Sequence, residues 1–463
     1  MKRRDFFAWL FFVLFSLFSS VILATADHSY DSYIAIAALP FVFFVCSLLF
    51  NNVYTHLSKN IGVLCLHSVM FIRMVLSPVL MAQANYDSIF RYILKEDINH
   101  AVVMLCYETV LVYGVLSFLI SHSKDKLSKE SYTIKCKRPS WLFRLIVLGM
   151  TVFCVAVWFA VPTCRELYKT IFEFGEETFT TVEYSASFEA VGSVERASQT
   201  LFKMLFDMLR LLLPMGLFIW FKRYRVSSFV AIVTGIILAF VQMLFISSTT
   251  ARAVICAFLI IYFIARLYPE HAKRIMNTAI VLSVLVIVAY FAIRFSVGSR
   301  YGTDPAEYLS KIVNAYFGGV DNVAAGSNLP EGFEASTFWA SLYSAIPFNS
   351  TLFGLKVENL QMLYNAANSS YGQIPPMIVE GEYYFGVVLA PLMSCLCAVG
   401  AYHYGEKYAK TTSAWHLISN LFIAIMCAIS VVMYNEEILL VWLIEWLLPM
   451  RILSALADRE KTT

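Results

Sequence analysis

Residues 6–24 read FFAWLFFVLFSLFSSVILA, and this run carries no charged side chain. An α-helix rises about 1.5 Å per residue, so about 20 apolar residues span the hydrocarbon core of a bilayer. The basic residues Lys2, Arg3 and Arg4 lie directly before the run. The stretch therefore predicts a membrane-spanning helix whose N-terminal end stays in the cytoplasm. A cleavable signal peptide ending near Ala24-Thr25-Ala26 is the alternative interpretation.

Similar apolar runs continue to the end of the chain. Of the 463 residues, 59% are hydrophobic and only 14% are charged, whereas about a quarter of a soluble domain is charged. We therefore predict an all-α polytopic membrane protein in which residues 1–463 form a single integral membrane domain with about twelve transmembrane helices. These spans are expected near 6–24, 33–50, 61–82, 100–121, 141–162, 203–220, 227–247, 251–268, 276–293, 383–402, 414–433 and 437–453.

Lys and Arg gather in alternate loops, which sets the orientation of the spans. The loop at 122–140 is strongly basic, and basic residues recur near 222–225, 266–274, 407–410 and 459–461. The loop at 163–202 instead carries seven Glu residues. Both termini are therefore expected in the cytoplasm, and 163–202 is expected as an acidic outer loop.

The longest segment without a predicted span is 294–382, which this orientation places outside the cell. It is too apolar for a solvated tail, with Phe333, Phe338, Trp339 and Tyr343 close together. We expect a large outward-facing loop of short helices between the ninth and tenth spans. Long loops of this kind are usually functional.

Several classes of function lack support in the sequence. The ten Cys residues mostly lie singly in apolar runs, and no CxxC or Cys/His spacing indicates a metal site. There is no GxxxxGK[ST] or GxGxxG motif for a nucleotide. The net charge of +3 is too small to indicate a nucleic-acid partner. No cofactor is expected.

Ionisable residues inside spans are costly and are therefore functional candidates. Arg73 lies near the middle of the third predicted span, and Asp207 and Arg210 lie three residues apart in the sixth. All three are therefore functional candidates. A structural ion pair or a side chain that reaches the interface is the alternative for each of them.

Three further arginines fall at the predicted outer surface. Arg252 follows a run of Ser and Thr at the start of the eighth span, where a helix N-terminus favours an anion. Arg294 and Arg300 follow the ninth span. Helix capping by the hydroxyls for Arg252, and flanking of a span for Arg294 and Arg300, are the alternatives.

The chain re-enters the membrane through residues 372–392, GQIPPMIVEGEYYFGVVLAPL. Glu380 and Glu382 stand at this entry, followed by Tyr383 and Tyr384. A carboxylate at a desolvated interface can act as a general base. An aromatic belt with solvated carboxylates is the alternative for this entry. The outer turn before the last span adds two further carboxylates, Glu436 and Glu437, for which solvated side chains are the alternative. Arg and Glu residues that converge on one outer surface suggest an anionic, lipid-linked substrate.

The order of these features resembles the bacterial polysaccharide repeat-unit polymerases, the Wzy-type O-antigen and capsule polymerases. The resemblance rests on about twelve spans, the large outer loop before the last three, and the pattern IPP-x3-EG-x-YYFG at residues 374–386. The Ser/Thr run before Arg252, and Arg73 ahead of Leu76-Ser77-Pro78, are similar to features of that family. The spacing from Arg300 to Gly318 departs from the Arg-to-Gly signatures of some members.

The resemblance implies a GT-C-like fold and an inverting, metal-independent glycosyl transfer from undecaprenyl pyrophosphate on the outer face of the bacterial cytoplasmic membrane. It implies a catalytic set of Glu380, Arg252 and Arg300. Substrate-binding roles would then fall to Arg73, Arg210, Arg294, Glu382, Tyr383 and Tyr384. The expected partners are an undecaprenyl-pyrophosphate-linked oligosaccharide, membrane lipids, a chain-length regulator and a flippase.

Three other functions fit parts of the sequence. A lipid-linked oligosaccharide flippase or other transporter would also use intramembrane Arg, but would not need an ordered outer loop of this length. A glycosyltransferase that uses a sugar on polyprenyl phosphate would carry acidic residues in its first outer loop, where Asp27 and Asp31 lie. An O-antigen ligase acting on a lipid A core is the third alternative.

Overall fold

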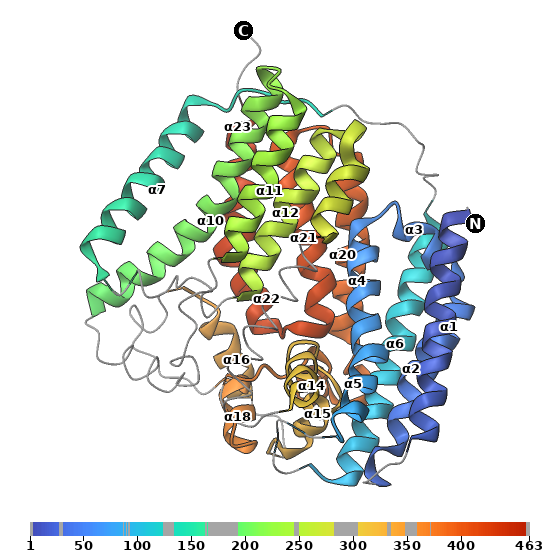
Figure 1. The fold of residues 1–463 in the computed structure, drawn as a ribbon. Helices are drawn as coiled ribbons and strands as arrows, with labels where there is room; N and C mark the ends of the chain where they lie inside the picture. Colours follow the sequence, from blue (N-terminus) through green and yellow to red (C-terminus); the bar gives the residue numbers. More distant parts are fainter. Residues whose placement is uncertain are drawn as a thin grey trace.

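A computed structural model describes residues 3–26, 31–86, 88, 90, 93–123, 134–162, 164, 193–244, 250–281, 304–330, 335–347, 359–370 and 372–459. These residues form helices and their connections (Figure 1). In this part of the chain, strand-like pairing occurs only as an isolated bridge between Lys135 and Ser413. The fold is therefore all-helical where it is described.

The first half of the chain supplies the following helices: α1 (Arg3–Thr25), α2 (Ala38–Leu49), α3 (Tyr54–Leu57), α4 (Ile61–Phe71), α5 (Ser77–Gln83), α6 (Lys95–His122), α7 (Trp141–Ala160) and α10 (Ser193–Arg223). The second half supplies α11 (Ser228–Leu244), α12 (Thr250–Leu267), α14 (Pro305–Tyr316), α15 (Val320–Ala324), α16 (Ala335–Ser344), α18 (Leu360–Ala367), α19 (Met377–Leu389), α20 (Leu392–Lys410), α21 (Ala414–Met433), α22 (Glu436–Trp442) and α23 (Leu448–Ala457).

Many of these helices are long and apolar enough to cross a membrane. Seven meet this test singly among the described residues, and three bent pairs bring the number to as many as ten. The lengths and composition of these helices are therefore those of a multi-pass membrane protein. The count of twelve spans stays a prediction, and the predicted ninth span at 276–293 is described only as far as residue 281.

The predicted span at 383–402 is not a single helix. The segment 383–402 crosses the bend between α19 and α20, where the axes turn by 105°. Gly386 has φ 73° and ψ 169°, which is not helical. Because a residue with a Cβ rarely adopts this conformation, glycine permits this kink inside α19, which precedes the bend between α19 and α20.

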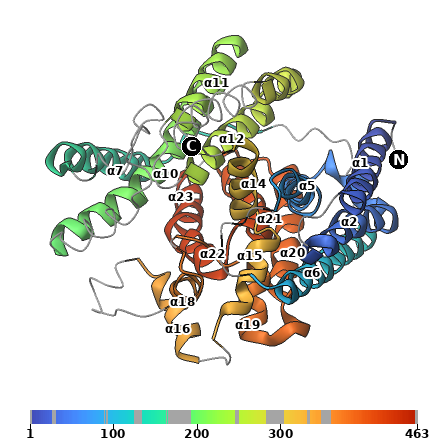
Figure 2. The same ribbon diagram turned by 60° about the horizontal axis from the view of Figure 1, so that its bottom comes forward.

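The core of the bundle lies around α21. In α21, 78% of the most apolar 18-residue stretch is buried inside the bundle, whereas only 17% of the corresponding stretch of α7 is buried. Helix α21 packs against α4, α12 and α20. Helices α4 and α20 approach closely at Gly62, where a Cβ would lie 2.0 Å from the Ala401 carbonyl oxygen. Helices α7 and α10 instead lean away from the bundle as a pair (Figures 1 and 2).

The two chain termini lie toward the same end of the bundle (Figure 1). At this end Ser58 donates a hydrogen bond to Asp5, and Ser413 donates one to Asp458. We call it the basic end, because a group of Lys and Arg residues gathers there: Lys135, Lys137, Arg138, Arg223, Arg266, Lys407 and Lys410. The opposite end, which we call the capped end, is covered by α14, α15, α16 and α18 (Figure 2).

Candidate functional site

Glu380 lies at the capped end, in the first turn of α19. The dipole of α19 favours a carboxylate at this position. Only 2% of Glu380 is exposed, yet its two oxygens differ. Oε2 accepts a hydrogen bond of 2.6 Å from the backbone N–H of Glu436, whereas Oε1 has no partner among the described residues. Since buried polar atoms are almost always paired, an unpaired Oε1 is unusual and marks Glu380 as a functional candidate.

Glu436 begins α22 directly opposite Glu380. Asn435 caps this helix by accepting from the backbone N–H of Ile438 at 3.1 Å. Glu436 is also buried, and its Oε1 has no partner in the part of the chain that is described. Two buried carboxyl groups with unpaired oxygens therefore meet where α19 and α22 begin.

Glu437, the next residue, holds the covering helices in place. It accepts from Ser344 Oγ at 2.6 Å and from Asn359 Nδ2 at 2.9 Å. Ser344 ends α16, and Asn359 is the N-cap of α18. Glu437 therefore ties two of the covering helices to α22.

Arg73 lies in a π-helical turn, Ile72–Leu76, between α4 and α5. It is 1% exposed, and its Nη1 donates to Glu108 Oε2 at 2.6 Å. Its Nε donates to the carbonyl of Gly318 at 2.8 Å, while Nη2 has no partner among the described residues. The other Glu108 oxygen accepts from Ser394 Oγ. Arg73 thus joins α4–α5, α6, α20 and the turn after α14.

Gly318 connects the Arg73 cluster with Glu380. Its φ is +50°, and a Cβ there would lie 2.6 Å from the Val432 carbonyl oxygen and 3.2 Å from Pro376. Pro376 is the N-cap of α19, and Val432 precedes α22 by one turn. The Gly318 backbone therefore packs between the start of α19, which carries Glu380, and the end of α21, which leads to Glu436.

A buried amide and carboxyl network fixes the turn between α14 and α15. Asn314 Nδ2 donates to Asp321 Oδ2 at 2.7 Å, and Asn322 Nδ2 donates to the Asn314 carbonyl at 2.9 Å. Burial raises the pKa of the Tyr364 phenol well above its usual value, and Asp321 raises this pKa further. The phenol therefore stays protonated and donates to the Asn322 carbonyl at 2.8 Å.

The residues that follow Glu380 occupy two environments. Tyr384 is buried, with its hydroxyl 3.1 Å from Ser341 Oγ and its ring edge-on to Phe338. Glu382 is partly exposed and lies 2.7 Å from His100 Nε2. The rings of Tyr383 and Tyr384 are in edge contact. Tyr384 therefore has aromatic and polar contacts within the bundle, and Glu382 has a histidine partner.

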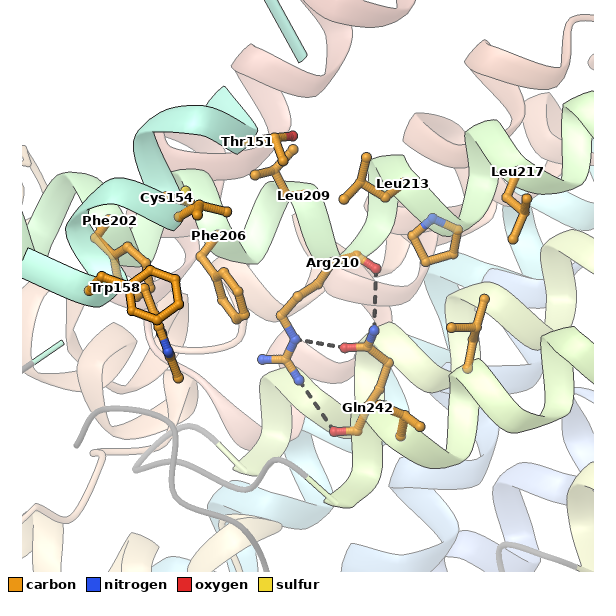
Figure 3. A pocket seen from close by; sticks show the side chains of 15 residues that line it. Thr151, Cys154, Trp158, Phe202, Phe206, Leu209, Arg210, Leu213, Leu217 and Gln242 are labelled. Carbon is orange, nitrogen blue, oxygen red and sulfur yellow. Dashed lines mark hydrogen bonds between the residues drawn. The ribbon is translucent and has the colours of Figure 1, made fainter. Parts of the chain in front are cut away.

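Arg210 lies in a different place from this cluster. It is paired with Asp207 at 3.4 Å and with Gln242 of α11, whose Oε1 accepts from Nε at 2.6 Å. Both Arg210 and Gln242 line an apolar cavity of about 730 Å³ between α7, α10 and α11 (Figure 3). The structure does not bring Arg210 together with Glu380.

The remaining predicted residues cannot be placed as side chains. Arg252 lies in the first turn of α12, but its side chain is outside the described residues. Arg294 and Arg300 are outside them entirely, as is Asp27. Asp31 begins a short 3-10 helix, and its side chain is not described.

Sequence reasoning missed Glu108, the partner of Arg73. The signal was present, because Glu108 is a charged residue inside the predicted span 100–121. The same rule that selected Arg73 would have selected Glu108. Ser394 and Asn314 are ordinary polar residues, and no pattern in the sequence distinguishes them.

The described residues contain no group of three or more His, Cys, Asp or Glu side chains arranged to hold a metal ion. Comparisons of the chain with protein-family models, with curated proteins and with solved structures found no match.

Proposed function

We propose that the protein polymerises lipid-linked oligosaccharide repeat units at the capped end of the bundle, by inverting glycosyl transfer from undecaprenyl pyrophosphate. The observation that supports this most is Glu380, a buried carboxyl group with one oxygen fixed by a backbone N–H and the other unpaired. A general base needs an oriented oxygen that is shielded from water and free to accept a proton.

The proposed reaction needs one proton transfer and one bond exchange. A hydroxyl oxygen of the acceptor repeat unit attacks the anomeric carbon of the donor glycan, and its proton passes to Glu380 Oε1. The bond between the anomeric carbon and the pyrophosphate oxygen breaks, and undecaprenyl pyrophosphate leaves with the electron pair. The donor brings its own leaving group, so no nucleotide is required.

The leaving pyrophosphate needs positive charge near it as the bond breaks. We assign this role to Arg252, Arg294 and Arg300. Arg73 and Arg210 are each already bonded to a carboxylate. We therefore assign Arg73 to positioning of the Gly318 turn, and Arg210 to the structure of the arm that α7 and α10 form.

The distribution of charge supports an assignment of the site to the outer face of the membrane. The basic end carries both termini and is assigned to the cytoplasm, so the capped end faces outward. An outward active face suits a repeat unit that has already crossed the membrane. The covering helices α14, α15, α16 and α18 give this face an ordered surface for a glycan.

A reconstitution experiment tests the proposal. Purified protein in detergent receives undecaprenyl-pyrophosphate-linked repeat units, and the products are sized by gel. We expect a ladder of longer lipid-linked glycans from the wild type and none from Arg300→Ala at equal protein concentration. A flippase would make no ladder in detergent, where no membrane needs to be crossed. Full polymer from Arg300→Ala would contradict its role at the pyrophosphate.

A further inference from the structure

A second cavity, of about 500 Å³, opens at the basic end, far from Glu380. It lies between the segment before α7, the first turns of α7, the last turns of α10 and the start of α21. Four cationic residues line it: Lys137, Arg138, Arg144 and Arg223. Its aromatic lining consists of Phe143, Trp220, Tyr224 and Trp415.

The charge in this cavity is unbalanced. No Asp or Glu is among the lining residues. None of the four cations forms an ion pair within the part of the chain that the structure describes. Like charges held close together repel one another, so an anion between them would lower the electrostatic energy.

Trp415 provides a second, independent observation. It is 2% exposed, and its indole Nε1 is buried without a hydrogen-bond partner among the described residues. The ring packs against Phe143, with the ring centroids 4.7 Å apart. A buried indole N–H usually finds an acceptor. Because Trp415 lines the cavity, a ligand there would bring its acceptor oxygens to the side chain that carries this N–H.

The position of the cavity along the bundle fits a lipid headgroup. Trp141, Trp220 and Tyr224 are exposed at this end of α7 and α10, as is typical of aromatic residues at a membrane interface. Closer to the middle of α10, Leu213 and Leu217 line both this cavity and the apolar cavity of Figure 3. The two cavities therefore share a wall, with cations at the interface and an apolar groove toward the membrane interior.

We propose that this composite cavity binds an anionic phospholipid. Its phosphate lies between Arg138, Arg144 and Arg223, and an acyl chain follows α10 into the groove beside α7. Basic pockets between transmembrane helices on the cytoplasmic side suit such headgroups. The proposal does not depend on the polymerase function, because none of these residues belongs to the Glu380 site.

Thermal unfolding of the delipidated protein in detergent tests the proposal. Dioleoyl phosphatidylglycerol is added in one series and dioleoyl phosphatidylcholine in another. We expect phosphatidylglycerol to raise the midpoint temperature in a saturable manner and phosphatidylcholine to have little effect. Replacing three cations in R138Q/R144Q/R223Q should weaken this binding on the order of 100-fold. All three side chains are exposed, so the variant should fold.

The matched control removes three exposed cations elsewhere, in K59Q/K273Q/R274Q, and should keep the wild-type response. Glycerol phosphate tests for a soluble anion in place of a lipid. The proposal is overturned if phosphatidylcholine acts as strongly as phosphatidylglycerol, if the cavity variant responds like the wild type, or if glycerol phosphate alone reproduces the shift.

Discussion

At the residue scale, the two unpaired carboxyl oxygens of Glu380 and Glu436 set this site apart from an ordinary helix interface. An unsatisfied buried polar group costs about 1–3 kcal/mol of stability. A catalytic role is one explanation for such a group. The partly exposed Glu382 does not carry this cost in stability, because its carboxylate pairs with His100.

Glu380→Gln should lower polymerisation about 10²–10⁴-fold, since the amide cannot accept the proton of the attacking hydroxyl. The amide is nearly the same shape, so the amount of folded protein should stay normal. The rate is measured in the detergent assay. Glu96→Gln, which changes an exposed carboxylate in the first turn of α6, is the control and should retain most activity. If Glu380→Gln polymerises at the wild-type rate, another group is the base.

Arg73 and Glu108 should depend on each other for stability. Glu108→Leu leaves a buried guanidinium without its carboxylate and should destabilise the protein by about 3–5 kcal/mol. Arg73→Met combined with Glu108→Leu removes both charges and should recover much of that loss. Thermal unfolding of the two single variants and the double variant gives the coupling between the sites. Additive losses would show that the pair is not coupled.

Gly318 should tolerate alanine much less well than Gly372 does. Both have positive φ, 50° and 68°, so alanine should cost each about 1–2 kcal/mol. Only at Gly318 would the new methyl group also press on Val432 and Pro376. Gly318→Ala should therefore unfold at a clearly lower temperature than Gly372→Ala. Equal midpoints would contradict the packing described at Gly318.

Ionisable residues in apolar runs were the part of the site that could be predicted from the sequence. Arg73 was selected in this way and Glu380 as a carboxylate where the chain re-enters the membrane, and both are buried. Their surroundings could not be predicted, because Arg73 bonds to Gly318, which is 245 residues away in the sequence. Local patterns contain no information about such contacts.

At the element scale, the helices bend where catalysis is proposed. A π-helical turn contains Arg73, and a bend of 105° separates α19 from α20. Hydropathy detects the length of an apolar run but not a change in helix direction, which explains why a single span was expected at 383–402. The bend lets α19 run across the end of the bundle, so that its first turn and Glu380 meet the start of α22.

Glu437 should hold the covering helices α16 and α18 in place against α22. It accepts from Ser344 and Asn359, so Glu437→Ala removes the bonds that hold α16 and α18 to α22. We expect faster amide hydrogen exchange in α16 and α18, with little change in α21. Glu406→Ala, which changes a carboxylate on α20 near the basic end, is the control. Unchanged exchange in α16 and α18 would show that other contacts hold them.

At the scale of the whole molecule, the two ends of the bundle have different chemistry. The all-helical, multi-pass architecture follows from apolar run length, because a helix must satisfy its backbone hydrogen bonds within the bilayer. The alternation of basic loops predicted which ends lie together, and both termini lie toward the basic end (Figure 1). The arm of α7 and α10 could not be predicted, since it depends on packing rather than hydropathy.

This arrangement makes a prediction about topology. Epitope tags at the two termini should be inaccessible to antibody in spheroplasts, whereas a tag inserted between Ser327 and Asn328 should be accessible, because both residues are exposed at the capped end. Permeabilised cells should label all three tags. Labelling of a terminal tag in intact spheroplasts would reverse the assigned orientation.

The most direct test of the central claim is the size of the surface glycan in the host after deletion of this gene, with the lipid-linked pool measured beside it. Complementation uses the wild-type gene or Glu380→Gln. The account predicts that a single repeat unit replaces the long polymer in the deletion strain and in the Glu380→Gln strain. Long polymer that persists without the gene, or repeat units stranded on the inner leaflet with no surface glycan, would contradict it.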